Sequence, residues 1–354
     1  MYRVAIFGRY FVAGVLCVAV VRYGCMKVLL LGASGLLGRN VMQVLVRRGH
    51  AVVALVRQSR RVADVEALPA SAVRLVEGDL LRRDVLKAAA QGCDAIINCA
   101  GTTDMSLRHY ADYVPVNVTL VQLLLDVSAE LGIGTLVHVS TANTVDYGTS
   151  QQPAREQGTL RSPFAEAFYA QSKMEGERLV RQAATRRADD HLVVVNPGFM
   201  VGAFDSKPSS GKLLQAAYRR PVMVAPRGGK SFVPVADAAE AVANALTRGR
   251  NGSRYLLTGD NLSLAAFYRL QADAMGYRQR VWQLPSWFVA AAGRVGDGLR
   301  WLGIRTQLSS VNVRQLMVRE YYDCTSAEEE LGLPHTDLAQ AVRDYFAWRQ
   351  AHRR

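Results

Sequence analysis

The sequence predicts an α/β fold, with a doubly wound parallel sheet and a smaller C-terminal subdomain. The first observation is a run of apolar residues, Val28 to Leu31, that ends in three glycines spaced three residues apart and is followed at once by a helical pattern. The second is the regular alternation of short apolar strands with helices as far as Val195. Strands and helices that alternate at these lengths indicate parallel strands joined by right-handed crossovers.

The glycine-rich segment is the feature around which the chain is organised. A buried strand, a tight turn and a helix N-terminus in this order direct backbone N–H groups at one point, and this arrangement suits a pyrophosphate. Glycines allow the phosphates and the preceding strand to approach the backbone closely. The residues predicted to bind a dinucleotide here are Gly32, Ser34, Gly35, Leu36, Leu37 and Gly38. The alternative is an ordinary turn between a strand and a helix.

Five further strands and five helices are predicted along the chain. The strands are expected at residues 51–56, 73–76, 95–98, 136–139 and 192–195, and the helices at about 37–48, 84–90, 118–131, 168–187 and 212–219. We expect residues 26–195 to form the dinucleotide-binding Rossmann-like core. Residues 196–350 are expected to complete that core and to form the substrate side.

Residues 1–25 do not match the pattern of the rest. An apolar run from Phe11 to Val21 lies between Arg9 and Arg22, and it is short for a membrane span, which needs about 20 residues. Three interpretations are open: an upstream start that is not used, a weak membrane anchor, or a signal-like leader. We favour the first, with Met26 as the natural start and a cytoplasmic protein, so membrane association is possible but not favoured.

Composition favours a small-molecule partner over nucleic acid. The chain of 354 residues carries a net charge of +13, but its arginines are scattered in pairs and no nucleic-acid motif accompanies them. A solvated basic surface is therefore the favoured interpretation, with no nucleic acid as partner. The five cysteines show no spacing typical of a metal site, which indicates a reducing compartment and no metal.

The ends of the second, third and fourth strands carry the other residues expected to contact a dinucleotide. Arg57 follows the second strand with Arg60 and Arg61 close behind, and arginines here suit the 2′-phosphate of NADP, whereas NAD favours an acidic residue. Asp79, followed by Leu80, either accepts a hydrogen bond from the adenine amino group or caps a helix. The small residues Cys99, Ala100 and Gly101 let a cofactor lie across the fourth strand end.

A tyrosine and a lysine supply the candidate chemistry. Tyr169 and Lys173 are four residues apart on a predicted helix, so their side chains share a face. A phenol has a pKa of about 10, and a nearby ammonium group is expected to lower it. The pair would then exchange a proton with a carbonyl or alcohol oxygen, to which Thr141 at the fifth strand end can also bond. Many helices contain a tyrosine and a lysine at this spacing. The pair therefore indicates catalysis only together with the hydroxyl of Thr141 and the glycine turn upstream.

These residues together resemble the extended branch of the short-chain dehydrogenase/reductase superfamily, the NAD-dependent epimerase/dehydratase family. The matching segments are Gly32 to Gly38, Asp79-Leu80, Asn98 to Gly101, Asn117, Ser140-Thr141 and Tyr169 to Lys173. The segments 196–202 and 229–239 resemble dihydroflavonol reductase-like and 3β-hydroxysteroid dehydrogenase-like members. The resemblance runs from Met26 nearly to the C-terminus.

The resemblance implies roles for individual residues. It makes Tyr169 the acid/base, gives Lys173 a contact with the nicotinamide ribose, and places Thr141 where a serine is usual. It implies that Asn117 orders the site and that Pro197, Gly198 and Phe199 lie beside the nicotinamide. One departure concerns Asn196, which stands where sugar epimerases and dehydratases of this branch commonly carry an arginine.

The function predicted is hydride transfer between a nicotinamide cofactor, preferably NADP, and a ketone or secondary alcohol. One alternative is a nucleotide-sugar epimerase or dehydratase with tightly bound NAD or NADP. A second alternative is a nucleotide-binding regulator without catalysis. A homodimer is possible. The aromatic residues Trp282, Trp287, Phe288 and Trp301 are expected to pack as core, with a pocket lining as the next choice and a membrane contact as the last.

Overall fold

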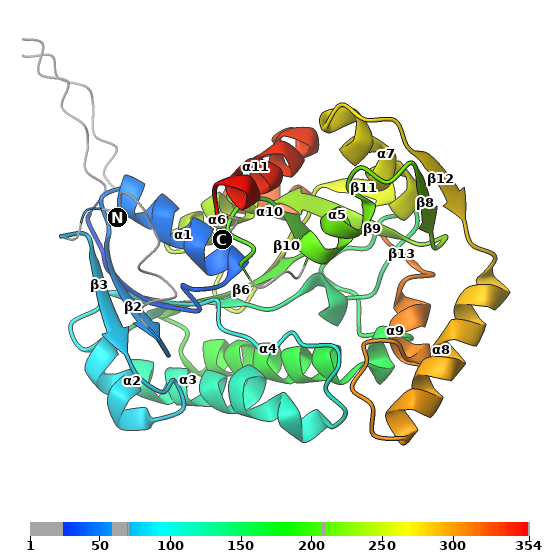
Figure 1. Cartoon of the computed structure of the whole chain (residues 1–354). Helices are drawn as coiled ribbons and strands as arrows, with labels where there is room; N and C mark the ends of the chain where they lie inside the picture. Colours follow the sequence, from blue (N-terminus) through cyan, green and yellow to red (C-terminus); the bar gives the residue numbers. More distant parts are fainter. Residues whose placement is uncertain (1–23, 59–68, 70, 207–209, 353–354) are drawn as a thin grey trace, which may run out of the picture.

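The computed structural model describes residues 24–58, 69, 71–206 and 210–352 (Figure 1). The helices are α1 (Leu36–Arg47), α2 (Arg83–Ala90), α3 (Leu120–Glu130), α4 (Phe168–Arg186), α5 (Gly211–Ala217), α6 (Val235–Asn244), α7 (Leu264–Ala274), α8 (Ser286–Trp301), α9 (Ser310–Gln315), α10 (Thr325–Leu331) and α11 (Leu338–Ala351). The strands are β1 (Lys27–Leu31), β2 (Ala51–Val56), β3 (Val73–Glu77), β4 (Ala95–Asn98), β5 (Thr135–Val139), β6 (His191–Pro197), β7 (Phe199–Val201), β8 (Val222–Ala225), β9 (Gly229–Pro234), β10 (Arg254–Leu257), β11 (Asp260–Ser263), β12 (Arg280–Gln283) and β13 (Arg319–Glu320).

A parallel sheet of seven strands confirms the predicted fold class. Its order is β10-β6-β5-β4-β1-β2-β3, and every neighbouring pair is parallel. The chain builds outward from β1 through β2 to β3, then returns to β4 on the other side of β1. This reversal between β1 and β4 leaves a crevice at the carboxyl ends of the strands, where open α/β sheets bind ligands.

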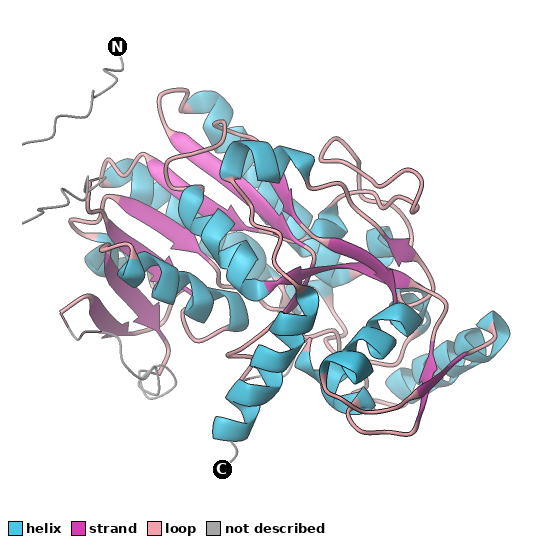
Figure 2. Cartoon of the chain, turned by 90° about the horizontal axis from the view of Figure 1, so that it is seen from above, coloured by secondary structure: helices cyan, strands magenta, loops and turns pink. Residues whose placement is uncertain are grey.

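Helices cover both faces of this sheet because its strands are apolar on both sides. One face packs against α1 and α6, with Leu30, Val41 and Val242 among the buried contacts. The other face packs against α2, α3 and α4 (Figures 1 and 2). A π-helical turn at Pro115–Thr119 precedes α3, so the helical segment begins before the predicted helix at 118–131 and overlaps it in this turn only at residues 118 and 119.

The C-terminal part contributes to the large sheet and also builds small sheets of its own. Strand β10 joins the large sheet beside β6, whereas β7, β9, β11 and β13 form a second sheet, and β8 pairs with β12. A separate apolar cluster joins the second sheet to α5, α7 and α11, with stacked rings of Phe232 and Phe267 4.0 Å apart. The predicted domain boundary after residue 195 stays a prediction.

The prediction that the C-terminal aromatic residues form a core is wrong. The side chains of Trp282, Trp287 and Phe288 are exposed, and Trp301 is 83% exposed. The physical reason is that α8 contacts α9 through its glycines. A Cβ atom at Gly293 would lie 3.0 Å from the Cα of Ser310, and one at Gly296 would overlap the carbonyl oxygen of Leu308. The large side chains of α8 are thereby turned away from the protein, whereas Trp282 lies in β12, part of a two-stranded sheet with β8.

Residues 1–23 lie outside the described residues, so the interpretation of residues 1–25 as an unused upstream segment stays a prediction. Arg60 and Arg61 also lie outside the described residues. Within the described part of the chain, no helix combines the length and the apolar character that a membrane crossing requires.

Candidate functional site

A cavity of about 420 Å³ lies at the reversal point of the large sheet. It runs from the glycine turn after β1, past the ends of β2 and β4, to the start of α4. Most of the residues predicted to bind a dinucleotide line it: Gly32, Ser34, Gly35, Leu36, Leu37, Gly38, Arg57, Asp79, Leu80, Cys99, Ala100, Gly101, Tyr169 and Lys173. One continuous cavity therefore brings together segments that are far apart in the sequence.

The three glycines of the turn meet three different requirements. Gly32 has a φ of +79°, and a Cβ there would overlap the backbone of Cys99 in the neighbouring strand end. A Cβ at Gly38 would overlap the carbonyl oxygen of Gly32, so this glycine lets α1 pack close to the turn. A Cβ at Gly35 would meet only the Gly32 carbonyl oxygen, at 3.3 Å, and Gly35 itself lines the cavity.

The N-terminus of α1 fits the anionic part of a dinucleotide. Gly35 is its N-cap residue, no side chain caps the helix, and its first turn contains no acidic residue. The first N–H groups of a helix carry partial positive charge and need acceptors. Backbone donors beside a glycine-lined wall are the arrangement that a pyrophosphate requires.

Arg57 and Asp79 lie at the far end of the same cavity. Arg57 follows β2 and is exposed, so its guanidinium is free to meet a ligand there. Asp79 lines the cavity, and its Oδ1 also accepts a hydrogen bond from the N–H of Leu81 at 3.0 Å. The interpretation of Asp79 as a helix cap is wrong, because Leu81 lies before α2, whose N-cap residue is Arg82 and which has no side-chain cap. The contact of Asp79 with an adenine amino group stays a prediction. Leu55, Val56 and Leu81 complete this end of the wall.

Tyr169 and Lys173 lie together on the first turns of α4, at the near end of the cavity. The side chain of Tyr169 is hydrogen-bonded to that of Thr141. The Nζ atom of Lys173 donates to the carbonyl oxygen of Val139, at the end of β5, over 2.7 Å. Thr141 is buried beside Tyr169 but does not line the cavity, whereas its neighbour Ser140 does.

The expected lowering of the Tyr169 pKa by Lys173 is not found. Burial raises the pKa of Tyr169, and the hydrogen bond with Thr141 acts in the opposite direction. Burial also lowers the pKa of Lys173 to about 8, while Glu177 and Cys99 oppose that shift. The reason is that the ammonium group is directed at Val139 and lies in a buried, weakly solvated position. The phenol is consequently protonated at neutral pH.

The buried ammonium group predicts that Lys173→Met stabilises the nucleotide-free protein at pH 7. A folded-state pKa of about 8 against 10.5 for the free side chain means that folding disfavours the charged form. The penalty is complete below pH 8 and disappears as the pH rises toward 10.5, since there the unfolded chain binds more protons. Chemical denaturation should show a gain of about 1–3 kcal/mol at pH 7 that shrinks by pH 10. Lys212→Met removes a surface lysine as the control, and a gain that does not depend on pH would contradict this account.

Asn117 lies behind the wall of the cavity and supports it through hydrogen bonds. Its Oδ1 accepts from the N–H of Thr102 at 2.8 Å, and its Nδ2 donates to the carbonyl oxygen of Thr102 and to Oγ of Ser172. It is buried and does not line the cavity. These bonds fix the loop after β4 to α4, so the position suits the ordering role that the resemblance implies, which stays a prediction.

A buried polar network behind Lys173 was missed by the sequence analysis. Glu177 lies one turn further along α4 and forms an ion pair with Arg254 of β10 at 2.9 Å. Its Oε2 accepts from Thr144 and from Nδ2 of Asn196, each at 2.9 Å. Asn196 is fully buried in this network. Tyr169, Lys173 and Glu177 follow one another at intervals of four residues, so they share a helix face. This spacing is the sequence signal from which Glu177 could have been predicted.

The predicted place of Pro197, Gly198 and Phe199 beside the nicotinamide stays a prediction. Pro197, Gly198 and Phe199 do not line the cavity, and the ring of Phe199 packs edge-to-face against Phe232 at 5.2 Å. Met200 lines the cavity instead, because successive side chains of β7 point to opposite sides. Asp205 and Ser206 also line it, and Asp205 Oδ2 accepts from the N–H of Gly211 at 2.7 Å.

A second cavity of about 250 Å³ begins on the other side of Tyr169. Its wall is mostly apolar and comes from the loop before α3, the start of α4, and the helices α8 and α9. The lining residues are Met105, Leu107, Tyr113, Glu166, Ala167, Phe168, Tyr169, Asp297, Arg300, Ser309, Val311 and Asn312. Arg300 and Asn312 donate to the carbonyl oxygens of Leu107 and Met105, which joins the C-terminal helices to this loop.

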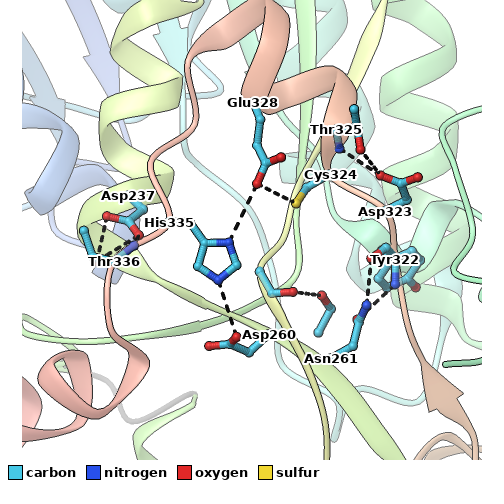
Figure 3. Close-up of polar contacts among 12 residues, drawn as sticks. Asp237, Asp260, Asn261, Tyr322, Asp323, Cys324, Thr325, Glu328, His335 and Thr336 are labelled. Carbon is cyan, nitrogen blue, oxygen red and sulfur yellow. Dashed lines mark hydrogen bonds and ion pairs between the residues drawn. The ribbon is translucent and has the colours of Figure 1, made fainter.

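A separate cluster of polar side chains joins the C-terminal segment to the second sheet (Figure 3). His335 lies between Glu328 and Asp260, at 3.7 and 3.4 Å, and Glu328 also accepts from Cys324. Burial, followed by the nearby Glu328 carboxylate, raises the pKa of Cys324 to about 12. The thiol is therefore protonated and a poor nucleophile. Among the residues that the structure describes, no group of acidic, histidine and cysteine side chains suits a metal ion.

Comparisons with known proteins agree with this geometry. Sterol demethylase protein B of Methylococcus capsulatus is 29% identical over 329 residues, which cover 91% of this chain and 98% of that protein. The enzyme 4-hydroxy-2-methyl-3-oxo-4-farnesyl-3,4-dihydroquinoline-1-oxide ketoreductase of Stigmatella aurantiaca is 31% identical over 296 residues, covering 82% of this chain and 85% of the relative. The crystal structure of the protein gox2253 superposes with a TM-score of 0.76 and 26% identity, covering 93% of this chain and 99% of that one.

The family model named NAD dependent epimerase/dehydratase matches residues 28–257. That range contains the glycine turn, the seven strands of the large sheet and the Tyr169–Lys173 pair. The similarity to the bacterial relatives extends over most of the remaining chain. The resemblance read from the sequence is thereby confirmed: the chain belongs to the NAD-dependent epimerase/dehydratase family, within the extended short-chain dehydrogenase/reductase superfamily.

Proposed function

We propose that the protein is an NADP-preferring oxidoreductase that interconverts a ketone and a secondary alcohol. The observation that carries the proposal is the position of Tyr169, whose side chain belongs to the walls of both cavities. One cavity has the phosphate-binding turn of a dinucleotide site, and the other is lined mainly by apolar side chains. A phenol between them is placed to exchange a proton with a substrate oxygen while the nicotinamide lies on its other side.

A bound nicotinamide supplies or accepts the hydride, and the residues of this chain handle the proton. Because burial raises the pKa of Tyr169, its hydroxyl carries the proton that a carbonyl oxygen needs during reduction. Thr141 bonds to the same hydroxyl and fixes its direction. Lys173 places a cation in the cavity beside Gly101, whose added Cβ would lie 3.7 Å from Nζ. Because Lys173 lines the cavity and its ammonium group is a donor, it is the proposed partner for a ribose hydroxyl.

The relatives support reduction as the reaction. The matched enzyme from Stigmatella aurantiaca is named as a ketoreductase, and the apolar wall around Leu107, Phe168 and Val311 suits a similarly apolar carbonyl compound. The competing proposal is a nucleotide-sugar epimerase or dehydratase. Against it, the residue where such enzymes commonly carry an arginine is Asn196. This side chain is buried among Thr141, Thr144 and Glu177 and lines neither of the two cavities described above.

A carbonyl screen with NADPH tests the proposed reaction. Purified protein is incubated with apolar ketones, with sugar nucleotides and with no substrate, while absorbance follows the reduced cofactor and chromatography follows the products. We expect one mole of NADPH to be oxidised for each mole of alcohol formed from an apolar ketone. Conversion of a sugar nucleotide without net consumption of NADPH would replace the proposal with the epimerase or dehydratase alternative.

The cofactor preference predicts a selective effect of Arg57→Ala. A guanidinium at the end of β2 contributes charged hydrogen bonds to a 2′-phosphate, and each is worth about 1.5–3 kcal/mol. Isothermal titration should therefore show NADPH binding weakened by about 10- to 100-fold, with NADH binding unchanged. Arg74→Ala, an exposed arginine on the adjacent strand β3, is the matched control. Equal losses for both cofactors would remove Arg57 from the 2′-phosphate site.

A further inference from the structure

Helix α8 is apolar on both sides, although it lies at the surface. Its inner side holds Val289, Gly293 and Gly296, all buried against the rest of the protein. The outer side repeats apolar residues at helical spacing, with Trp287, Val295 and Leu302 exposed by 71%, 62% and 66%. The exposed Arg294 lies on the same outer side, seven residues after Trp287, so this side combines large apolar residues with a positive charge.

The exposed apolar surface extends beyond the helix. We call it the α8 face, and it consists of Val222, Val224, Trp282, Trp287, Phe288, Val295, Trp301, Leu302, Ile304 and Leu308. Trp282 lies beside Val224 because β12 and β8 pair in that register. The α8 face stands at the end of the molecule opposite β2 and β3 (Figure 1). These exposed apolar residues include three of the chain's four tryptophans, and exposed apolar residues gathered on neighbouring elements mark a surface that meets a partner.

The close contact between α8 and α9 keeps the exposed side chains of α8 on its outer side. Rotation of α8 about its axis would bring them against α9, and α9 is in contact with the backbone of α8. The nearest atoms to a Cβ at Gly293 and at Gly296 are those of Ser310 and Leu308. The aromatic side chains of α8 are therefore exposed because the glycines of α8 pack against Ser310 and Leu308.

The charges around the α8 face indicate what kind of partner it takes. Between residues 276 and 308 the chain carries five arginines and one carboxylate, Asp297. Asp297 accepts a hydrogen bond from the N–H of Ser310 at 3.0 Å. Arg278, Arg280, Arg294 and Arg305 are exposed. A symmetric contact with a second copy would bring these arginines together, and like charges repel at such an interface.

We propose that the α8 face docks on an anionic lipid surface, with the tryptophans in the headgroup region and the arginines on the lipid phosphates. Tryptophan suits this position because its ring is apolar while its N–H bonds to the headgroup layer. A helix with exposed large apolar residues and arginines lies in the plane of the interface without crossing it. A chain with a net charge of +13 is also attracted to an anionic surface from a distance.

Vesicle flotation of the full chain tests the proposal. The probes are vesicles of phosphatidylcholine alone and vesicles of phosphatidylcholine with 30% phosphatidylglycerol. The second composition is chosen so that the surface potential of the vesicles is in the range of anionic membranes, about −30 mV. The double variants W287S/W301S and R294E/R305E are compared with L75S and R186E, which change an exposed leucine of β3 and an exposed arginine of α4. Thermal melting and NADPH binding verify that each variant is folded.

We expect the unchanged chain to float with the anionic vesicles, and its tryptophan emission to shift to shorter wavelength. Both α8 variants should lose at least about tenfold in vesicle affinity, consistent with the aromatic and charge contributions at a lipid surface. L75S and R186E should bind as the unchanged chain does. Because the comparison is made within full-length chains, any binding by the apolar N-terminal residues is common to all of them.

Several results would overturn the proposal. Equal binding by the α8 variants and their controls would place the lipid contact elsewhere in the chain, and no binding to anionic vesicles would remove it. Analytical ultracentrifugation covers the remaining possibility. A dimer that dissociates in W287S/W301S would assign the α8 face to a second copy of the chain in place of lipid.

Discussion

Tyr169→Phe should reduce turnover by about 10²-fold or more, in line with the contribution of general acid–base catalysis. The ring remains in place, so packing between the two cavities is retained, but the proton for the substrate oxygen is lost. Because Tyr169 is hydrogen-bonded to Thr141 and not to Lys173, the nucleotide contacts of Lys173 should survive. Steady-state kinetics on the ketone found by screening, together with NADPH titration, should show kcat falling while the cofactor Kd changes little.

The matched control for this variant is Tyr110→Phe. Tyr110 also loses only a phenolic hydroxyl, but that hydroxyl bonds to Glu175 and lines neither cavity. Its activity should stay close to that of the unchanged enzyme. If Tyr169→Phe kept full activity, Tyr169 would not be the proton donor, and the protein would leave the class of tyrosine-dependent reductases.

Gly35→Val should abolish detectable NADPH binding while the fold is retained. The added Cβ meets only the Gly32 carbonyl oxygen at 3.3 Å, and φ at Gly35 is −89°, which valine adopts readily. The branched side chain enters the cavity where the pyrophosphate must approach the N-terminus of α1. Fluorescence titration should show an affinity loss of at least about 100-fold, equivalent to about 3 kcal/mol, and circular dichroism should show an unchanged fold.

Gly38→Ala separates a ligand effect from a structural one at the same turn. Its Cβ would overlap the carbonyl oxygen of Gly32, so α1 must shift away from the turn. We expect a lower melting temperature for Gly38→Ala and a nearly unchanged one for Gly35→Val. Unaltered NADPH affinity in Gly35→Val would show that the nucleotide does not approach this turn.

Local patterns made much of the fold and the cavity predictable from the sequence. The glycine turn is a continuous segment between a strand and a helix, so its position and the ligand that it suits follow from neighbouring residues alone. Tyr169 and Lys173 share a helix face at a spacing that any helix reproduces. The small residues 99–101 and Arg57 directly follow apolar strands, and parallel strands end at one edge of the sheet.

Features that depend on distant contacts escaped the sequence analysis. The partners of Glu177 come from β6, β10 and the loop after β5, and nothing local relates these segments. Met200 lines the cavity in place of Phe199 because the side-chain alternation of β7 is set by its pairing with β9. The orientation of α8, with aromatic residues outward, depends on how closely Ser310 and Leu308 approach its glycines.

The two cavities that meet at Tyr169 have a consequence for the order of events during turnover. One is walled by the sheet edge and α1, the other by α8, α9 and the loop before α3. On the proposed function, the nucleotide and the substrate would occupy different cavities on the two sides of Tyr169. We therefore expect a spent nucleotide and a finished product to leave independently, with no compulsory order of binding.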